Sequence, residues 1–169
     1  PDGKILASGS SDATSKIWDV ESGKLLRTLS GLNVGVNSVA IAPDGQTLAS
    51  VSNDYTIKLR NLHTGSLLRI LNSNSARGKG VANLGMNEAM HILQNYVSRG
   101  DSVAIGQDGL TLVSGCDDNT INIWNLQTGE LLSALKGHSG TVYSVAIAPK
   151  GNLLASGSAD ETIKIWRCD

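Results

Sequence analysis

The chain has 169 residues, of which 40% are hydrophobic, and its formal net charge is −1. This content is enough for a folded core, and the near-neutral charge gives no electrostatic basis for binding nucleic acid or an anionic membrane. No apolar run approaches the roughly 20 residues that span a bilayer. The chain starts at Pro1 with no signal peptide before it, so we expect it to begin inside a longer protein.

A phrase of 13 residues occurs four times along the chain, in near-identical form. The copies are LASGSSDATSKIW at 6–18, LASVSNDYTIKLR at 48–60, LVSGCDDNTINIW at 112–124 and LASGSADETIKIW at 154–166. Their aspartates are Asp12, Asp54, Asp118 and Asp160, which are 42, 64 and 42 residues apart. A constant period with one excess of 22 residues predicts a repeat protein that carries one insertion.

Each repeat contains up to four short apolar runs, and their length and β-branched content predict strands rather than helices. Turns with Pro-Asp-Gly or a variant, at 1–3, 43–45, 107–109 and 149–151, separate the first run from the second. A glycine ends the turn between the third and fourth runs, at Gly23, Gly65 and Gly129. The repeat is therefore predicted to be a four-stranded antiparallel meander, and the chain to be all-β.

Taken in chain order, the repeats are expected at approximately 1–31, 34–72, 101–137 and 141–169, with the insertion at approximately 73–100. Counting the apolar runs gives three, four, four and three strands. The first unit therefore lacks its inner strand and the last unit lacks its outer strand.

These units resemble the WD40 family of β-propellers. The matching features are the Gly137-His138 pair, the small residues of the first strand, the LASGS second strand, the turn aspartate and the closing tryptophan. The Trp-Asp dipeptide survives only as Trp18-Asp19. The resemblance, closest to regular bacterial members, implies a segment of about four blades, the first and last incomplete, that forms part of a larger ring.

The family's structural tetrad links a histidine, a serine or threonine, the turn aspartate and the tryptophan by hydrogen bonds. In the last repeat the resemblance carries this tetrad to His138, Ser156, Asp160 and Trp166. Partial tetrads are expected at Ser8, Asp12 and Trp18, at Ser50 and Asp54, and at Ser114, Asp118 and Trp124. Because the second repeat has Leu32 and Arg60 in place of His and Trp, and the third has Tyr96 in place of His, we expect Asp160→Ala to cost more stability than Asp54→Ala.

Partners of the family often bind the top face, at the start of the first strand and before the turn aspartate. The resemblance places Asn37, Asn53, Arg99, Asp101, Asp117, Thr141 and Tyr143 there. Tyr143 is the aromatic member of this set and the best anchor candidate. The alternative interpretation is that these residues only solvate a rim of loops.

The insertion contains a small, basic stretch at 73–80 and a segment at 87–97 whose pattern predicts a short helix. One hypothesis is a lid or docking helix on the top face, and the other is a degraded repeat junction without a specific role. Its Gly-Lys-Gly at 78–80 lacks the spacing of a phosphate-binding loop.

No catalytic, metal or cofactor site is expected from the remaining residues. His63 lies in a turn, His91 has no partner at ligand spacing, and the pair Asp117-Asp118 belongs to a repeated turn. His138, Ser156 and Asp160 are hydrolase-triad residue types, but the serine is expected to be buried between blades.

The sequence therefore favours a non-catalytic protein–protein interaction scaffold within a larger signalling or regulatory protein. It predicts protein or peptide partners on the top face, and no nucleic acid or membrane partner. Cys116 and Cys168 are expected to be reduced, in the cytoplasm. Two alternatives stay open: a purely structural or degenerate repeat segment without a partner, and self-association of two chains into an eight-bladed propeller through open blade edges.

Overall fold

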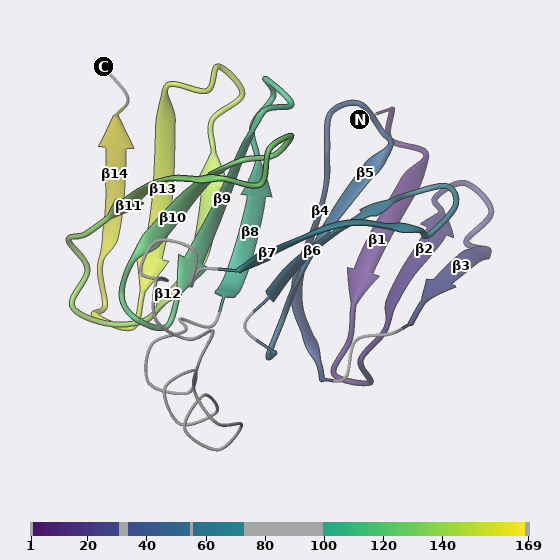
Figure 1. Cartoon of the computed structure of the whole chain (residues 1–169), viewed down its shortest axis with the longest axis horizontal. Coiled ribbons are helices and arrows are strands. Elements are labelled where there is room, and N and C mark those ends of the chain that lie inside the picture. Colours follow the sequence, from purple (N-terminus) through teal and green to yellow (C-terminus); the bar gives the residue numbers. More distant parts are fainter. Residues whose placement is uncertain (1, 31–33, 55, 73–99, 168–169) are drawn as a thin grey trace, which may run out of the picture.

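The fold is an array of four antiparallel sheets that follow one another in chain order (Figure 1). A computed structural model describes residues 2–30, 34–54, 56–72 and 100–167. Each sheet is a meander in which sequence neighbours are paired, and the first and last sheets have three strands while the middle two have four. We call these sheets blades 1 to 4.

The strands have the following bounds. Blade 1 contains β1 (Ile5–Gly9), β2 (Ser15–Asp19) and β3 (Leu25–Leu29). Blade 2 contains β4 (Val36–Ile41), β5 (Thr47–Ser52), β6 (Thr56–Asn61) and β7 (Leu67–Asn72). Blade 3 contains β8 (Gly100–Ile105), β9 (Thr111–Cys116), β10 (Ile121–Asn125) and β11 (Leu131–Leu135). Blade 4 contains β12 (Val142–Ile147), β13 (Leu153–Ser158) and β14 (Ile163–Arg167).

Local turn chemistry explains why each blade is a meander. The turn after β4 has Gly45 at φ 67°, a conformation that glycine adopts without strain. The carboxylate of Asp44 accepts hydrogen bonds from the backbone amides of Gln46 and Thr47, at 2.8 and 3.2 Å. These contacts reverse the chain within a few residues, so the next strand pairs with the one before it.

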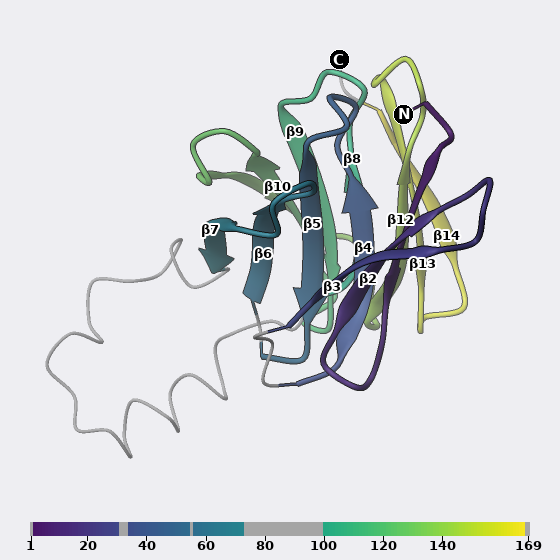
Figure 2. The ribbon, with the colours of Figure 1, turned by 90° about the vertical axis from the view of Figure 1, so that its right-hand side faces the viewer.

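The hydrophobic core lies between the blades. Three separate clusters fill the three junctions, and each combines residues of two consecutive blades. Figure 2 shows the inner strands β4, β8 and β12 side by side, which agrees with their tertiary contacts. Serine hydroxyls also join these strands, because Ser38 Oγ accepts from Val103 N and Ser102 Oγ accepts from Val145 N, both at 3.2 Å.

Every inner strand carries a β-bulge near its start. The pairing register shifts between Val36 and Ser38, between Gly100 and Ser102, and between Val142 and Ser144. The extra residues are therefore Asn37, Asp101 and Tyr143. A bulge re-aims the side chain that it carries, so three bulges at one repeat position place these side chains at one end of the blades.

The all-β prediction is confirmed by these fourteen strands of the described residues. The expected helix at 87–97 and most of the insertion at 73–100 lie outside the part of the chain that the structure describes, as do Leu32, Arg99 and Cys168. The described residues include no helix that could cross a membrane.

Candidate functional site

Blade 4 contains a hydrogen-bonded set of four side chains from two strands and two loops. His138 precedes β12, Ser156 lies on β13, and Trp166 lies on β14. His138 Nδ1 is 2.8 Å from Asp160 Oδ2, and His138 Nε2 is 2.7 Å from Ser156 Oγ. Trp166 Nε1 donates to Ser156 Oγ at 2.8 Å. The structure thus brings together all four residues that the resemblance assigns to the tetrad.

The donors and acceptors of this set can be arranged so that each donor meets an acceptor. The Trp166 indole can only donate, so Ser156 Oγ accepts from it and keeps its own hydrogen to donate to His138 Nε2. With Nε2 accepting, the neutral imidazole carries its hydrogen on Nδ1 and donates to the carboxylate of Asp160. The backbone amide of Ser139 donates to the same oxygen at 2.9 Å. Every polar group of the set therefore has a partner, as buried polar groups require.

This connectivity of serine, histidine and aspartate is also that of a hydrolase triad. Ser156, however, is only 2% exposed, and its oxygen already accepts from the Trp166 indole. A nucleophile must reach the carbonyl that it attacks. The geometry therefore supports a stabilising role for these side chains.

Asp160 is held in its charged form by its hydrogen bonds. The Thr162 hydroxyl, 2.6 Å from Asp160 Oδ1, contributes most to lowering the pKa of this carboxyl well below its ordinary value. The Ser139 amide and the His138 ring lower the pKa further, whereas desolvation acts in the opposite direction. The carboxylate is consequently an acceptor at neutral pH.

The same aspartate–threonine contact occurs in all four blades, and the sequence analysis missed it. The threonine hydroxyl donates to the aspartate two residues earlier at 2.5–2.6 Å in Asp12–Thr14, Asp54–Thr56, Asp118–Thr120 and Asp160–Thr162. The signal is present in the repeated phrase, where a threonine stands two residues after each aspartate. In blade 1, the Thr14 hydroxyl is also the main cause of the lowered pKa of Asp12.

Blades 1 and 3 keep the serine–tryptophan half of the set. Trp18 Nε1 donates to Ser8 Oγ at 3.0 Å, and Trp124 Nε1 donates to Ser114 Oγ at 3.1 Å. Trp124 is buried in the core cluster between blades 2 and 3. Its indole therefore both fills that junction and satisfies the buried hydroxyl.

Blade 2 uses a different partner for its turn aspartate. Lys58 Nζ forms an ion pair with Asp54 Oδ2 at 2.5 Å and also lies 3.0 Å from Thr56 Oγ1. Partial burial alone would raise the pKa of Asp54, but the hydrogen bonds from Lys58 and Thr56 outweigh burial and lower it. Lys58 thus meets the same carboxylate oxygen that His138 meets in blade 4, a role that the sequence analysis did not assign.

Arg60 stands at the tryptophan position of blade 2, and its hydrogen bonds go to backbone carbonyls. Its guanidinium donates to the carbonyls of Gly65 and Ser30, at 3.2 and 3.1 Å. Ser50 Oγ instead donates to the Lys58 carbonyl at 3.4 Å. The predicted pair Ser50 and Asp54 is therefore split between two separate groups of hydrogen bonds.

The bulge residues and the residues before the turn aspartates lie at one end of the blades. Backbone hydrogen bonds from Asn53 N to Gly35 O and from Ala159 N to Thr141 O, at 3.0 and 2.8 Å, tie these positions together. We call the surface made by Asn37, Asn53, Asp101, Asp117, Thr141, Tyr143 and Ala159 the top face.

The top face has a polar part and an aromatic part. Asn37 Nδ2 donates to Asn53 Oδ1 at 2.8 Å and lies 3.4 Å from Asp101 Oδ1, so the amide connects blade 2 to blade 3. Tyr143, the bulge residue of blade 4, is 59% exposed. Asp117 is exposed and Thr141 is half-buried. The predicted top-face residues thus share one end of the molecule, except Arg99, which lies outside the described residues.

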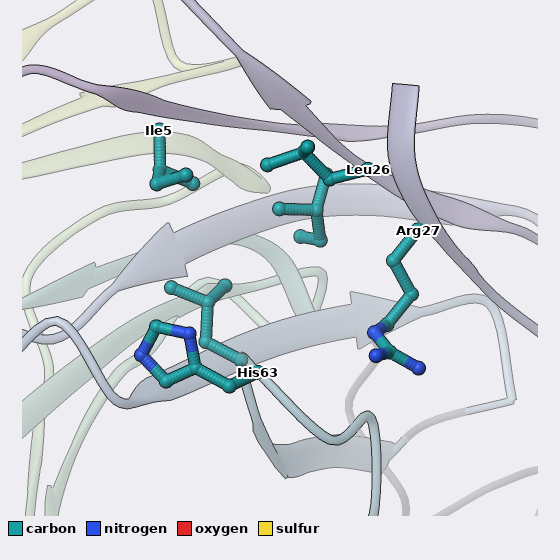
Figure 3. Close-up of a pocket in the computed structure, with 6 residues that line it drawn as sticks. Ile5, Leu26, Arg27 and His63 are labelled. Atoms are coloured by element: carbon teal, nitrogen blue, oxygen red, sulfur yellow. The ribbon is translucent and has the colours of Figure 1, made fainter. Parts of the chain in front are cut away.

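A small pocket lies where blade 1 meets blade 2 (Figure 3). Its volume is about 150 Å³, and it is lined by Ile5, Ile17, Leu26, Arg27, Leu62 and His63. Cofactor and drug-sized sites are typically about 300–1,000 Å³, so this pocket has room for a single side chain. Within the described ranges, no group of three or more His, Cys, Asp or Glu residues could hold a metal ion.

Antiparallel meanders that pack face to face along their inner strands define the class of β-propeller blades. The family model for the WD domain, G-beta repeat, matches residues 1–19, 23–61, 94–125 and 129–167. The chain therefore belongs to the WD40 family, as the repeat pattern predicted. WD40 repeats generally mediate protein–protein interactions and generally form non-catalytic scaffolds.

Protein tipD of Dictyostelium discoideum is a similar relative. It is 28% identical to this chain over 127 residues, which are 74% of this chain and 17% of tipD. The chain thus matches less than a fifth of the length of this curated relative.

Proposed function

We propose that this chain is a non-catalytic scaffold whose top face binds a protein or peptide, with Tyr143 as the anchor. The observation that carries this proposal is the exposure of Tyr143 on a β-bulge. Because the Tyr143 side chain is 59% exposed, it contributes little to the free energy of folding. Its ring can still bury apolar area against a partner. The rigid strand pair β12 and β13 holds its backbone, so little conformational entropy is lost on binding.

The polar residues of the top face are suited to fix the orientation of such a partner. Asp117 carries a carboxylate and Thr141 a hydroxyl, while Asn37 and Asn53 carry amides that hydrogen-bond to each other. Interfaces of this kind combine a buried aromatic anchor with a polar rim. An extended peptide with an apolar side chain and several hydrogen-bond donors has the matching chemistry.

The setting of this scaffold is part of the same proposal. We place it within a larger signalling or regulatory protein of the cytoplasm, and its match to only 17% of tipD supports the longer parent protein alone.

A displayed library of random peptides tests the binding face. Peptides selected on the wild-type chain should bind Tyr143→Ala at least about tenfold more weakly, because a central aromatic anchor contributes 1.4 kcal/mol or more, the equivalent of about a tenfold affinity change. Asp117→Ala should weaken binding by a smaller factor.

Leu132→Ala is the matched control, because Leu132 is 57% exposed but lies on the outer strand β11. It should leave peptide affinity unchanged, and none of the three variants should change the melting temperature by more than a few degrees. Equal affinity of the selected peptides for the wild type and Tyr143→Ala would reject the top face as the binding site. The same result would favour a purely structural repeat segment.

A further inference from the structure

The pocket between blades 1 and 2 has an apolar interior and a cationic rim (Figure 3). The side chains of Ile17 and Leu62, each 3% exposed, make up its buried part. Two further lining residues, Arg27 and His63, are exposed. The pocket therefore combines an apolar surface inside with nitrogen donors at the opening.

The exposed apolar wall of the pocket, Leu26, belongs to a repeated bulge. The pairing of β2 with β3 shifts between Ile17 and Trp18, so Leu26 is an extra residue near the start of the outer strand. Leu68 and Leu132 are the corresponding extra residues of blades 2 and 3, and the three leucines are 53%, 54% and 57% exposed. Because blades 2 and 3 each have a neighbour on both sides, this exposure is a property of the repeat position and not of the place of blade 1 in the array.

Arg27 crosses the junction from β3 to the β6–β7 turn of blade 2. A Cβ atom at Gly65, in that turn, would lie 3.4 Å from Arg27 Cδ and 3.8 Å from its Nη1, so the arginine side chain lies over the glycine. Arg60 donates to the Gly65 carbonyl at 3.2 Å, which brings a second guanidinium to the same turn. Among the described residues, no carboxylate forms an ion pair with Arg27 or Arg60. The rim of the pocket is therefore a site of unbalanced positive charge.

We propose that this pocket binds an acidic peptide, with one leucine-sized side chain of the peptide in its interior and a neighbouring peptide carboxylate paired with Arg27. An apolar cavity of about 150 Å³ holds a benzene-sized group, and such a group leaves water on binding. A guanidinium binds a carboxylate through two parallel hydrogen bonds. The His63 ring lies on the opposite side of the pocket from Leu26 (Figure 3) and can donate a further hydrogen bond to the peptide.

The pocket is separate from the top face. Asn53 of the top face comes just before the β5–β6 turn region, whereas His63 lies in the β6–β7 turn. Consecutive turns of a meander lie at opposite ends of its strands, so the pocket and the top face lie at opposite ends of blade 2. A peptide in the pocket therefore leaves Tyr143 accessible, and each of the two sites is tested without the other.

The junction between blades 2 and 3 repeats the arginine but not the apolar wall. Thr47 stands there at the repeat position of Ile5, which lines the pocket between blades 1 and 2, and burying its hydroxyl against an apolar group is unfavourable. Arg69 nevertheless lies over the turn glycine Gly129 as Arg27 does one blade earlier, because a Cβ atom at Gly129 would lie 2.5 Å from Arg69 Cδ. Arg69 is consequently a matched control for Arg27.

Displayed peptides with one fixed leucine, a fixed glutamate beside it and random flanks are the probe. The bait is the whole chain with Tyr143→Ala, so that peptides anchored on the top face are not selected. Fluorescence anisotropy then measures the affinity of enriched peptides for further variants of this bait. Arg27→Ser should weaken binding about tenfold or more, since hydrogen bonds to a charged group are lost. Leu26→Asp should weaken it as much, because it places a like charge beside the peptide carboxylate.

Arg69→Ser and Leu68→Asp are the controls, with the same substitutions at the same repeat positions one blade later. Blade 3 already has a serine, Ser133, at the position of these arginines. Both controls should leave the affinity unchanged, and all four variants should melt at nearly the same temperature, since each replaced side chain is exposed. Equal losses in Arg27→Ser and Arg69→Ser would show a general attraction of charge and would overturn the pocket as the site.

A peptide with glutamine in place of its fixed glutamate tests the pairing with Arg27. It should bind the bait about tenfold more weakly than the original peptide and should lose nothing further on Arg27→Ser, because both changes remove one interaction. Losses that simply add would overturn the pairing of Arg27 with the peptide carboxylate. A selection that enriches no peptide would overturn the proposal as a whole.

Discussion

At the scale of the residue, the four turn aspartates illustrate how one repeated side chain acquires different surroundings. Asp160 accepts from a histidine, a backbone amide and a threonine. Asp54 accepts from a lysine and a threonine. In both blades the carboxylate is charged and well satisfied, so the variation lies in which neighbour supplies the second donor. The stability that each aspartate contributes depends on what its removal leaves unpaired.

Replacing Asp160 with Ala should therefore lower the free energy of unfolding more than replacing Asp54. The first change removes the 2.8 Å acceptor of the buried His138 ring, which keeps only Thr162 Oγ1 at 3.3 Å, and it also removes the acceptor of the Ser139 amide. The second leaves Lys58, which is 8% exposed but also lies 3.0 Å from Thr56 Oγ1, and should cost about 1–2 kcal/mol. Urea unfolding at neutral pH measures the free energy of unfolding of each variant.

A double variant measures how much of the stability lost in Asp54→Ala comes from leaving Lys58 without its carboxylate partner. Asp54→Ala together with Lys58→Met should be more stable than Asp54→Ala alone, because it removes a charge that has lost its partner. If Asp54→Ala proved to be the more damaging single change, the ion pair would outweigh the histidine-centred set.

The depressed pKa of Asp160 also predicts a dependence of stability on pH. The folded-state pKa of Asp160 lies below the ordinary value of 3.8, so the stabilisation is fully present above that value and is lost as the pH falls toward the folded-state pKa. The free energy of unfolding should thus decrease from about pH 5 downward. Asp160→Asn should show a shallower decrease in acid titrations followed by urea unfolding; parallel curves would contradict this assignment.

At the scale of the element, the turn between the second and third strands of a blade has a defined conformation. The residue between the aspartate and the threonine adopts a positive φ, at 66° for Ala13, 69° for Asn119 and 64° for Glu161. Asparagine tolerates this region, whereas other residues with a Cβ are strained there. The strain is accepted because the aspartate–threonine hydrogen bonds fix the turn on both sides.

Replacing Glu161 with Asn should accordingly stabilise the chain by about 0.5–1 kcal/mol, which corresponds to a rise in melting temperature of about 1–4 °C for a domain of this size. Glu161→Ala serves as the control and should have almost no effect, because alanine meets the same strain. A thermal melt that gives equal shifts for both variants would show that the side-chain charge, and not φ, decides the outcome.

At the scale of the whole molecule, stability comes from the junctions between blades. Each blade is a thin sheet without a core of its own, and the three hydrophobic clusters each join two blades. Repeat proteins of this kind depend on nearest-neighbour interfaces. The position of a residue in the array therefore matters as much as its position in the repeat.

Two leucines at the same repeat position test this point. Leu112 is fully buried and Leu6 is 56% exposed. Leu112→Ala should lower the free energy of unfolding by about 2–5 kcal/mol, whereas Leu6→Ala should change it by about 0.5 kcal/mol or less. The measurement is chemical unfolding at a concentration where the chain is monomeric, and similar losses would show that burial at the junctions does not dominate.

Much of the fold and part of the site follow from the sequence, while the rest depends on contacts between distant residues. The period and the turns predict the number and order of the strands, and the resemblance names His138, Ser156, Asp160 and Trp166. The bulges at Asn37, Asp101 and Tyr143 were not predicted, since they arise from the pairing of β4, β8 and β12 with their neighbours.

The sequence by itself determined the repeating meander, because strand length, turn glycines and alternating apolar runs are local properties of the chain. Only the tertiary structure decided that Lys58 faces Asp54, that the bulge residues share one end, and that Leu6 is exposed where Leu112 is buried. The physical reason is that burial and hydrogen-bond partners are set by the neighbouring strand or blade, which a single repeat does not encode.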